Sequence, residues 1–291
     1  MNNTQKILIG VALAATAGLY YFGSTVGPKK GGASPQAQAA DTSHNHDPLD
    51  LAKVRAGAMS QLSQTQQQYI NTLENTVSRG DVKSQQAAAH RSLASFWKDS
   101  VASPILHFQH LSLASELDNT EKSLTFAAHS ILGYLPYAHN HLEQEWLANR
   151  GKELFDKAFA MNESNDSTIV GLGGTIIYGA KSAEGPMAGI MKVRAVVEKD
   201  STNMFAQYML GVGGVISGQY DKAAQRFEKV TKAQPDNLEV WFKLAEAYEL
   251  ANMNPQAIST YEKIEQKVSV PEMKTEIQKR IAQLKSAAPG K

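Results

Sequence analysis

Hydrophobic and small residues recur at a fixed interval in the last third of the chain. Four matched pairs are each separated by 34 positions: Asn203 and Asn237, Leu210 and Leu244, Ala223 and Ala257, and Phe227 and Tyr261. An interval of this size is typical of a repeated pair of antiparallel helices. Since one helical hairpin cannot bury its apolar face alone, consecutive hairpins must stack. The pattern therefore predicts an all-α solenoid whose clearest repeats are 204–237 and 238–271.

Weaker helical periodicity extends the repeats towards the amino end, so that they cover 81–271. Gly151, Phe155 and Ala158 predict another second helix before its exit turn. Phe155 and Val193 are 38 residues apart, and we place about four extra residues in the glycine- and proline-containing stretch 179–186. We expect about five hairpins in all, followed by a polar-faced capping helix and tail over 272–291.

An amphipathic helix is expected before the repeats, over 48–80. Its apolar residues form one stripe within 49–77, opposite a glutamine-rich face. Such a helix can lie along the first repeat or self-associate as a coiled coil, and the stripe has too few Leu and Ile to favour the coiled coil. Gly80 is expected to end this helix and Asp81 to cap the next one.

The amino-terminal residues differ from the rest of the chain. No charged residue lies between Lys6 and Lys29. About 20 helical residues span about 30 Å, which is the thickness of a bilayer's hydrocarbon core. We therefore expect a membrane anchor over 1–28, with a single transmembrane helix over 7–26, and a flexible linker over 29–47. A cleaved signal peptide is the alternative. A short amino tail before a large carboxyl-terminal domain favours export of that domain.

Composition narrows the possible functions. The formal net charge is +1 and no dense basic run is present, so a nucleic-acid partner is not expected. The chain has no cysteine, which excludes disulfides, thiolate metal sites and cysteine nucleophiles. Apolar residues make up 42% and charged residues 20%, which is ordinary for a globular protein.

The repeat residues also follow a known family signature. Trp241, Leu244, Ala245 and Tyr248 have the spacing of a first repeat helix, and Ala257 and Tyr261 that of a second. The chain therefore resembles the tetratricopeptide-repeat superfamily, and more narrowly the membrane-anchored repeat proteins of bacterial envelopes. The resemblance implies a right-handed solenoid with a concave groove that binds a protein segment, and export of the domain would place this solenoid on the periplasmic side. Superfamily membership does not name the partner.

The resemblance also implies which residues line the groove, namely four positions on one face of each first helix. In the two clearest repeats these are Phe205, Tyr208, Val212, Val215, Glu239, Phe242, Glu246 and Glu249. An earlier, diverged copy contributes Thr168, Gly171, Thr175 and Tyr178. The lysine and asparagine clamp of chaperone-binding members is not matched at these positions. A groove that is part aromatic and part acidic suits an amphipathic or basic segment. In the competing interpretation, Phe205, Tyr208 and Phe242 pack against neighbouring helices.

Candidate chemistry is limited to scattered histidines and two incomplete glycine motifs. The possible ligand clusters are His44, His46 and Asp47, then His107 and His110, then His139, His141 and Glu143. A catalytic zinc site would need three fixed ligands and an open position, so polar surface is the simpler interpretation. The stretch 174–182 lacks the adjacent glycine and lysine of a phosphate-binding loop, and 211–216 lacks the third glycine of a dinucleotide fingerprint. We expect no metal, no cofactor and no catalysis.

The expected function is therefore a membrane-tethered, non-catalytic scaffold or adaptor that binds a protein partner through its groove. Two alternatives remain. One is a self-associating structural envelope protein, in which the helix over 49–77 forms a homo-oligomer. The other is a metal-dependent enzyme, which only the histidines support.

Overall fold

The structure is a computed structural model that describes residues 49–79, 82–180 and 185–287. The chain divides into two units between Asp47 and Pro48, and the described residues all belong to the second. The expected anchor, its transmembrane helix and the linker lie outside the described residues, as do Gly80 and Asp81. None of the helices in the described ranges combines the length and apolar character needed to cross a membrane.

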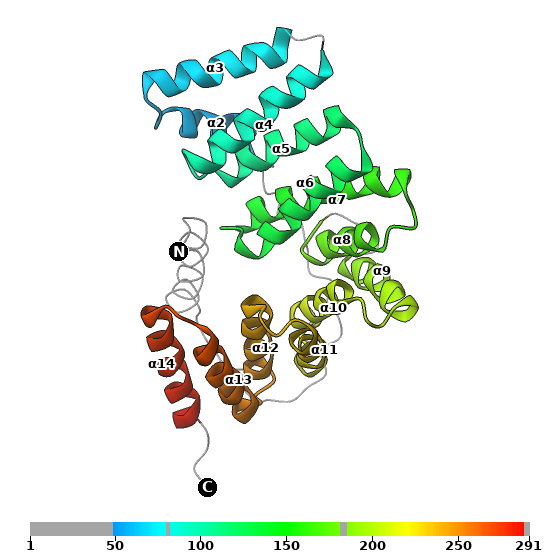
Figure 1. The fold of residues 1–291 in the computed structure, drawn as a ribbon, viewed down its shortest axis with the longest axis vertical. Helices are drawn as coiled ribbons and strands as arrows, with labels where there is room; N and C mark the ends of the chain where they lie inside the picture. Colours follow the sequence, from blue (N-terminus) through cyan, green and yellow to red (C-terminus); the bar gives the residue numbers. More distant parts are fainter. Residues whose placement is uncertain (1–48, 80–81, 181–184, 288–291) are drawn as a thin grey trace, which may run out of the picture. The chain divides into compact units, whose positions relative to one another are not determined.

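Every regular element in these ranges is helical, which confirms the all-α fold class (Figure 1). The α-helices are α2 (Leu51–Met59), α3 (Gln64–Arg79), α4 (Lys83–Asp99), α5 (Pro104–Asp118), α6 (Glu121–Tyr134), α7 (His141–Met161), α8 (Asp166–Ile177), α9 (Pro186–Lys199), α10 (Met204–Ile216), α11 (Tyr220–Ala233), α12 (Leu238–Leu250), α13 (Asn254–Lys267) and α14 (Pro271–Ala287). A short 3₁₀ helix, η1 (Leu135–Tyr137), joins α6 to α7.

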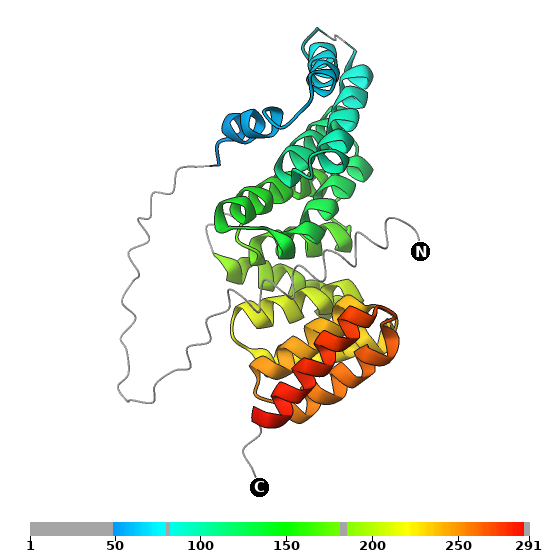
Figure 2. The same cartoon turned by 90° about the vertical axis from the view of Figure 1, so that its left-hand side faces the viewer.

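Consecutive helices pair into hairpins, and each hairpin stacks on the next. The pairs are α4 with α5, α6 with α7, α8 with α9, α10 with α11 and α12 with α13, and α14 packs on α13. Figures 1 and 2 show this succession from the amino-terminal helices to the carboxyl-terminal one. The expected five hairpins and the terminal helix are thus present in the described part of the chain.

Asparagine caps set the register of the repeats. The side-chain oxygens of Asn165, Asn203 and Asn237 accept hydrogen bonds from backbone N–H groups in the first turns of α8, α10 and α12. These caps are 38 and then 34 positions apart, whereas α9 and α11 begin 34 apart, at Pro186 and Tyr220. The extra residues therefore lie between α8 and α9, as the sequence predicts.

A glycine brings the two helices of a repeat together. A Cβ atom built on Gly211 of α10 would lie 2.5 Å from Cε1 of Phe227 on α11. Phe227 is fully buried, so its ring fills the space that the missing side chain leaves. The turn that follows needs a positive φ, which is 72° at Gly218 and 59° at Asn252, the equivalent residue 34 positions later. Glycine and asparagine are the residues that adopt this conformation most readily.

The expected single helix over 48–80 is wrong, because the structure has two helices there. The chain turns between Met59 and Gln64, where the side chain of Gln66 accepts a hydrogen bond from the backbone N–H of Ser63. Arg55 of α2 then forms a salt bridge of 2.6 Å with Glu74 of α3. The apolar face of α3 packs on α4 within the same chain, with Ile70 fully buried.

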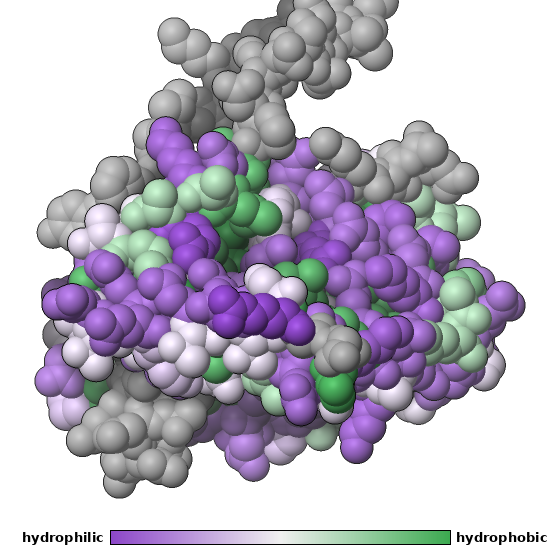
Figure 3. Space-filling view, turned by 90° about the horizontal axis from the view of Figure 1, so that it is seen from above, coloured by the Kyte–Doolittle hydropathy of each residue, from purple (hydrophilic) through white to green (hydrophobic). Residues whose placement is uncertain are grey.

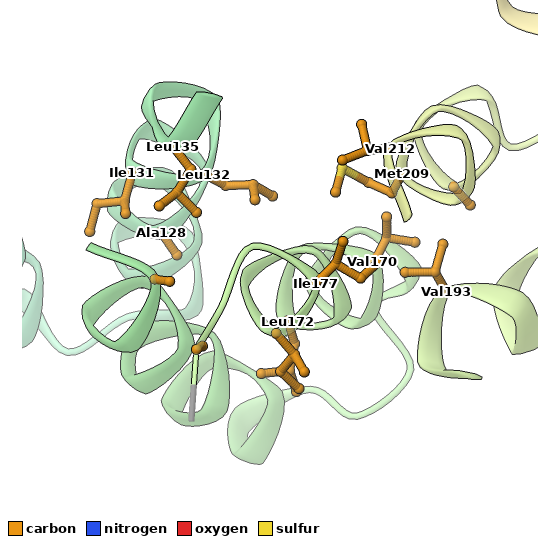
Figure 4. Close-up of a cluster of buried hydrophobic side chains, with 14 of the residues drawn as sticks. Ala128, Ile131, Leu132, Leu135, Val170, Leu172, Ile177, Val193, Met209 and Val212 are labelled. Carbon is orange, nitrogen blue, oxygen red and sulfur yellow. The ribbon is translucent and has the colours of Figure 1, made fainter. Parts of the chain in front are cut away.

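The main core runs through the first helices of successive hairpins. Figure 4 shows Leu132 of α6, Val170 of α8, and Met209 and Val212 of α10 within one group of buried side chains. The outer surface is different in character. The face seen in Figure 3 is mainly hydrophilic, with hydrophobic residues in separate patches.

Candidate protein-binding surface

Three tyrosines and two glutamates from successive elements come together beside the first repeat helices. Tyr137 of η1, Tyr178 at the end of α8, and Tyr208 of α10 lie near Glu239 and Glu246 of α12, close enough for the charges to perturb the phenols. The hydroxyl of Tyr208 donates a hydrogen bond of 2.8 Å to Oε1 of Glu239. These five residues are referred to below as the tyrosine–glutamate cluster.

Local structure fixes each member of the cluster. Tyr208 packs its ring against Phe227, with 5.8 Å between the ring centroids. The backbone carbonyl of Tyr178 accepts a hydrogen bond of 2.8 Å from Nε2 of Gln144 on α7. Glu239 lies in the first turn of α12, where the helix dipole favours a carboxylate. Tyr137 is 38% exposed, so the cluster is open to solvent on one side.

The phenols of the cluster remain protonated at physiological pH. Burial raises the pKa of Tyr208 and Tyr178 well above the usual value of 10, and the Glu239 carboxylate raises both further. Burial and Glu239 also raise the pKa of Tyr137. The hydroxyls are therefore neutral donors, and the negative charge of the cluster comes from its two glutamates.

The three expected groove carboxylates have different partners. Glu246 accepts a hydrogen bond of 2.9 Å from Nζ of Lys243, which lies on the same helix. Glu249 is held by Arg280 of α14 and by the Tyr261 hydroxyl, at 2.7 Å. Glu239 accepts from Tyr208 and, within the described ranges, forms no salt bridge. Glu239 is exposed, and so it is the carboxylate most available to a partner.

The apolar groove residues are less available than the sequence suggests. Val212 is only 5% exposed and belongs to the core, so placing it on the binding surface is wrong. Phe205 is partly buried and its ring lies against His129, with 5.5 Å between centroids. Phe242 packs on the carboxyl-terminal cluster of α12, α13 and α14, and Val215 packs against the main core.

Three of the four groove positions assigned to the earlier copy face the core, whereas the fourth, Tyr178, belongs to the tyrosine–glutamate cluster. Thr168 and Thr175 are fully buried, and a Cβ on Gly171 would lie 2.2 Å from the ring of Phe155 on α7. The cap Asn165 is 38 positions before Asn203, so Phe205 corresponds to Ser167 instead of Thr168. In this register the remaining positions are Val170, Gly174 and Ile177, and these are buried as well, so α8 presents few side chains to the groove.

Three contributors to this surface were not assigned to it from the sequence. Tyr137 follows α6 in a 3₁₀ helix, outside the family's helical positions. Tyr261 and Arg280 come from α13 and α14, and they reach the surface because both contact Glu249. No local pattern in the sequence brings these residues together, because their convergence depends on how the repeats stack.

The structure separates the candidate histidine clusters. Nδ1 of His107 lies 2.9 Å from the backbone oxygen of Ala94, whereas Nδ1 of His110 lies 3.0 Å from Nδ1 of His90 on α4. His139 contacts Glu143 at 3.1 Å. Across the described residues, no three or more His, Asp or Glu side chains are grouped so as to hold a metal ion. His44, His46 and Asp47 lie outside these residues.

Comparison with known proteins identifies the repeats. Residues 215–275 match the family model of the tetratricopeptide repeat. The curated proteins give no match. Similar solved structures include a crystal structure of MamA, with 18% identity, a TM-score of 0.40, and coverage of 61% of this chain and 92% of that one.

Two further solved structures give similar values. "MamA 41-end from Desulfovibrio magneticus RS-1" has 14% identity, a TM-score of 0.41, and coverage of 65% and 96%. YrrB, described as a TPR protein with an unusual peptide-binding site, has 18% identity, a TM-score of 0.39, and coverage of 66% and 92%. These likenesses are too distant to carry an argument, so the assignment rests on residues 215–275 and on the contacts of the repeats themselves.

Proposed function

The chain belongs to the tetratricopeptide-repeat superfamily through residues 215–275, and from this premise we propose that it is a non-catalytic scaffold that binds a protein partner. The observation that supports this proposal is the tyrosine–glutamate cluster on the first repeat helices. Its phenols are donors with large apolar rings, and tyrosine is enriched in protein interfaces for this reason.

The chemistry of the cluster favours a basic or amphipathic segment as the partner. Glu239 is exposed, and it has no cationic partner among the described residues. A partner that brings positive charge to this surface would gain electrostatic attraction and faster association. The contacts of Glu246 with Lys243 and of Glu249 with Arg280 leave Glu239 as the centre of this attraction.

We further propose that a membrane tethers the scaffold, through the apolar segment 7–26, and that the repeats lie on the exported, periplasmic side. The support is the uncharged stretch between Lys6 and Lys29. Reporters that work only inside or only outside the cytoplasm, fused to the carboxyl end, test the orientation. Activity of only the cytoplasmic reporter would contradict export.

The binding surface is tested by crosslinking the full-length protein in its native membrane. The test variant combines Tyr137→Ala with Glu239→Lys, because both residues are exposed and neither is in the core. The matched control is Glu272→Lys, which changes an exposed glutamate in the first turn of α14. Both variants lose one first-turn carboxylate. The double variant also loses the hydrogen bond from Tyr208, which contributes about 0.5–1.5 kcal/mol, so the free energy of unfolding of both variants is measured alongside.

We expect at least one abundant partner to be crosslinked to the wild type and to the Glu272 variant. The same partner should be reduced roughly tenfold or more in the double variant, since charge reversal at an interface costs several kcal/mol. Unchanged partners in the double variant would contradict the proposed surface. Capture of only the same protein would instead support self-association.

A further inference from the structure

We propose that the tyrosine–glutamate cluster binds the guanidinium group of an arginine in the partner's segment. This inference rests on the scaffold function proposed above and specifies what its binding surface recognises. The cluster combines an exposed carboxylate with phenol rings, and both features favour a planar cation. The occupant is thus a protein segment that carries an arginine at its point of contact.

The same chain already contains an arginine bound by a tyrosine and a glutamate. Arg280 of α14 reaches Glu249 on α12, donating from Nε to Oε1 at 3.1 Å and from Nη2 to Oε2. The hydroxyl of Tyr261 donates to that same Oε1 at 2.7 Å. One carboxylate thus accepts a phenol and a bidentate guanidinium together.

The pair formed by Tyr208 and Glu239 repeats the first half of this arrangement. Its phenol-to-carboxylate hydrogen bond is 2.8 Å long, against 2.7 Å between Tyr261 and Glu249. The cation is the difference, because Glu239 pairs with no lysine or arginine in the described part of the chain. A guanidinium from a partner would complete the arrangement in the way Arg280 completes it at Glu249.

The other members of the cluster favour arginine over lysine. Tyr137 and Tyr178 lie near enough to Glu239 for its charge to raise their pKa, so the cluster contains aromatic rings as well as a carboxylate. A guanidinium can stack on an aromatic face while it donates two parallel hydrogen bonds to a carboxylate. A lysine ammonium has no planar face to stack and cannot form the bidentate pair. Residues 1–47 contain lysines but no arginine, so this segment does not supply the proposed group.

The inference is tested with peptides selected from a random phage-displayed library against the full-length protein in detergent. The strongest binder is synthesised with its own sequence and, separately, with citrulline in place of each of its arginines in turn. Citrulline keeps the shape and removes the charge. Fluorescence anisotropy then gives the dissociation constants for the wild type, Glu239→Gln, Tyr208→Phe and the control Glu272→Gln.

We expect citrulline at one position to weaken binding to the wild type and to the Glu272 variant by roughly tenfold or more. In Glu239→Gln the same replacement should have less than about a threefold effect, because the charge partner is already lost. Tyr208→Phe should reduce the arginine dependence to an intermediate value.

Two results would overturn the inference in different ways. In the first, citrulline replacement leaves the affinity unchanged, but the double variant Tyr137→Ala with Glu239→Lys still binds the peptide more weakly than the wild type. This result would reject the arginine subsite and leave the scaffold function standing. In the second, no substitution in the cluster lowers the affinity for the peptide. This result would reject both proposals, because the peptide would then bind at another surface.

Discussion

The amino-terminal hairpin α4–α5 and the repeat α10–α11 have the same architecture but are held together by different contacts. In α10–α11 the helices meet at Gly211, against the buried ring of Phe227. In α4–α5 they meet at a pair of imidazoles, His90 and His110, whose ring centroids are 5.2 Å apart. The first contact depends on shape and the second on protonation, so the two regions should respond differently to mutation and to pH.

The helix N-caps of the two regions also differ, in whether their side chains bond the first turn. Asn203 and Asn237 each bond the first turn of their helices. Val82 and Ser103, the caps of α4 and α5, make no such side-chain hydrogen bond. The first helix of each regular repeat thus has a side-chain cap, whereas both helices of the amino-terminal hairpin rely on their packing. The recurring asparagine caps are one of the features that make the 34-residue period visible at the carboxyl end.

The largest effect is expected from Phe227→Ala in the carboxyl-terminal region. Removing a fully buried aromatic ring should lower the free energy of unfolding by about 3–5 kcal/mol, measured by urea denaturation. Because repeats contact only their neighbours, hydrogen exchange should rise most in α10, α11 and α12 and least in α4 and α5.

Phe126→Ala is the control for this change, because Phe126 is 64% exposed. It should change the free energy of unfolding by no more than about 0.5 kcal/mol. Equal exchange in both regions of the Phe227 variant would show that the solenoid unfolds as one cooperative unit and that the two regions do not differ in their response to mutation.

Acid should loosen the amino-terminal hairpin first. Burial, His90 and then Arg55 lower the pKa of His110 from 6.5 to about 4, and burial also lowers the pKa of His90. The unfolded chain therefore binds more protons than the folded one between these values, and stability falls as pH decreases through that window. The hydrogen bond between the two Nδ1 atoms needs one unprotonated nitrogen, so a second proton breaks it.

Between pH 7 and about pH 4 the free energy of unfolding should fall by roughly 2–3 kcal/mol. Hydrogen exchange in α4 and α5 measures this change. The replacement His110→Gln removes the group with the largest shift and should flatten most of this dependence, while His90 and His107 still titrate and α10 and α11 keep the same profile. An unchanged pH profile in that variant would show that other groups govern the acid sensitivity.

The sequence predicts the structure best where the contacts are local or repeated. The caps Asn203 and Asn237, with the alternation of small and aromatic residues, predict the hairpins and the terminal helix. The break between Met59 and Gln64 was missed because a continuous apolar stripe can run through two helices as well as one. The sequence predicts only some members of the tyrosine–glutamate cluster. Tyr137 joins it through the stacking of elements about 100 positions apart, which no local pattern records.

The smallest effect is expected from replacing helical glycines by alanine, which should change the free energy of unfolding in opposite directions at two positions. Both Gly211 of α10 and Gly133 of α6 would gain helix propensity, worth about 0.5–1 kcal/mol. At Gly133 no atom lies within 4 Å of the added Cβ, so Gly133→Ala should raise the free energy of unfolding by that amount. At Gly211 the Cβ would meet Phe227 at 2.5 Å, and overpacking should lower it by about 1–3 kcal/mol. Urea denaturation of both variants measures the difference. If both raised stability, the ring of Phe227 would have room to move, and the close approach of α10 and α11 would not depend on glycine.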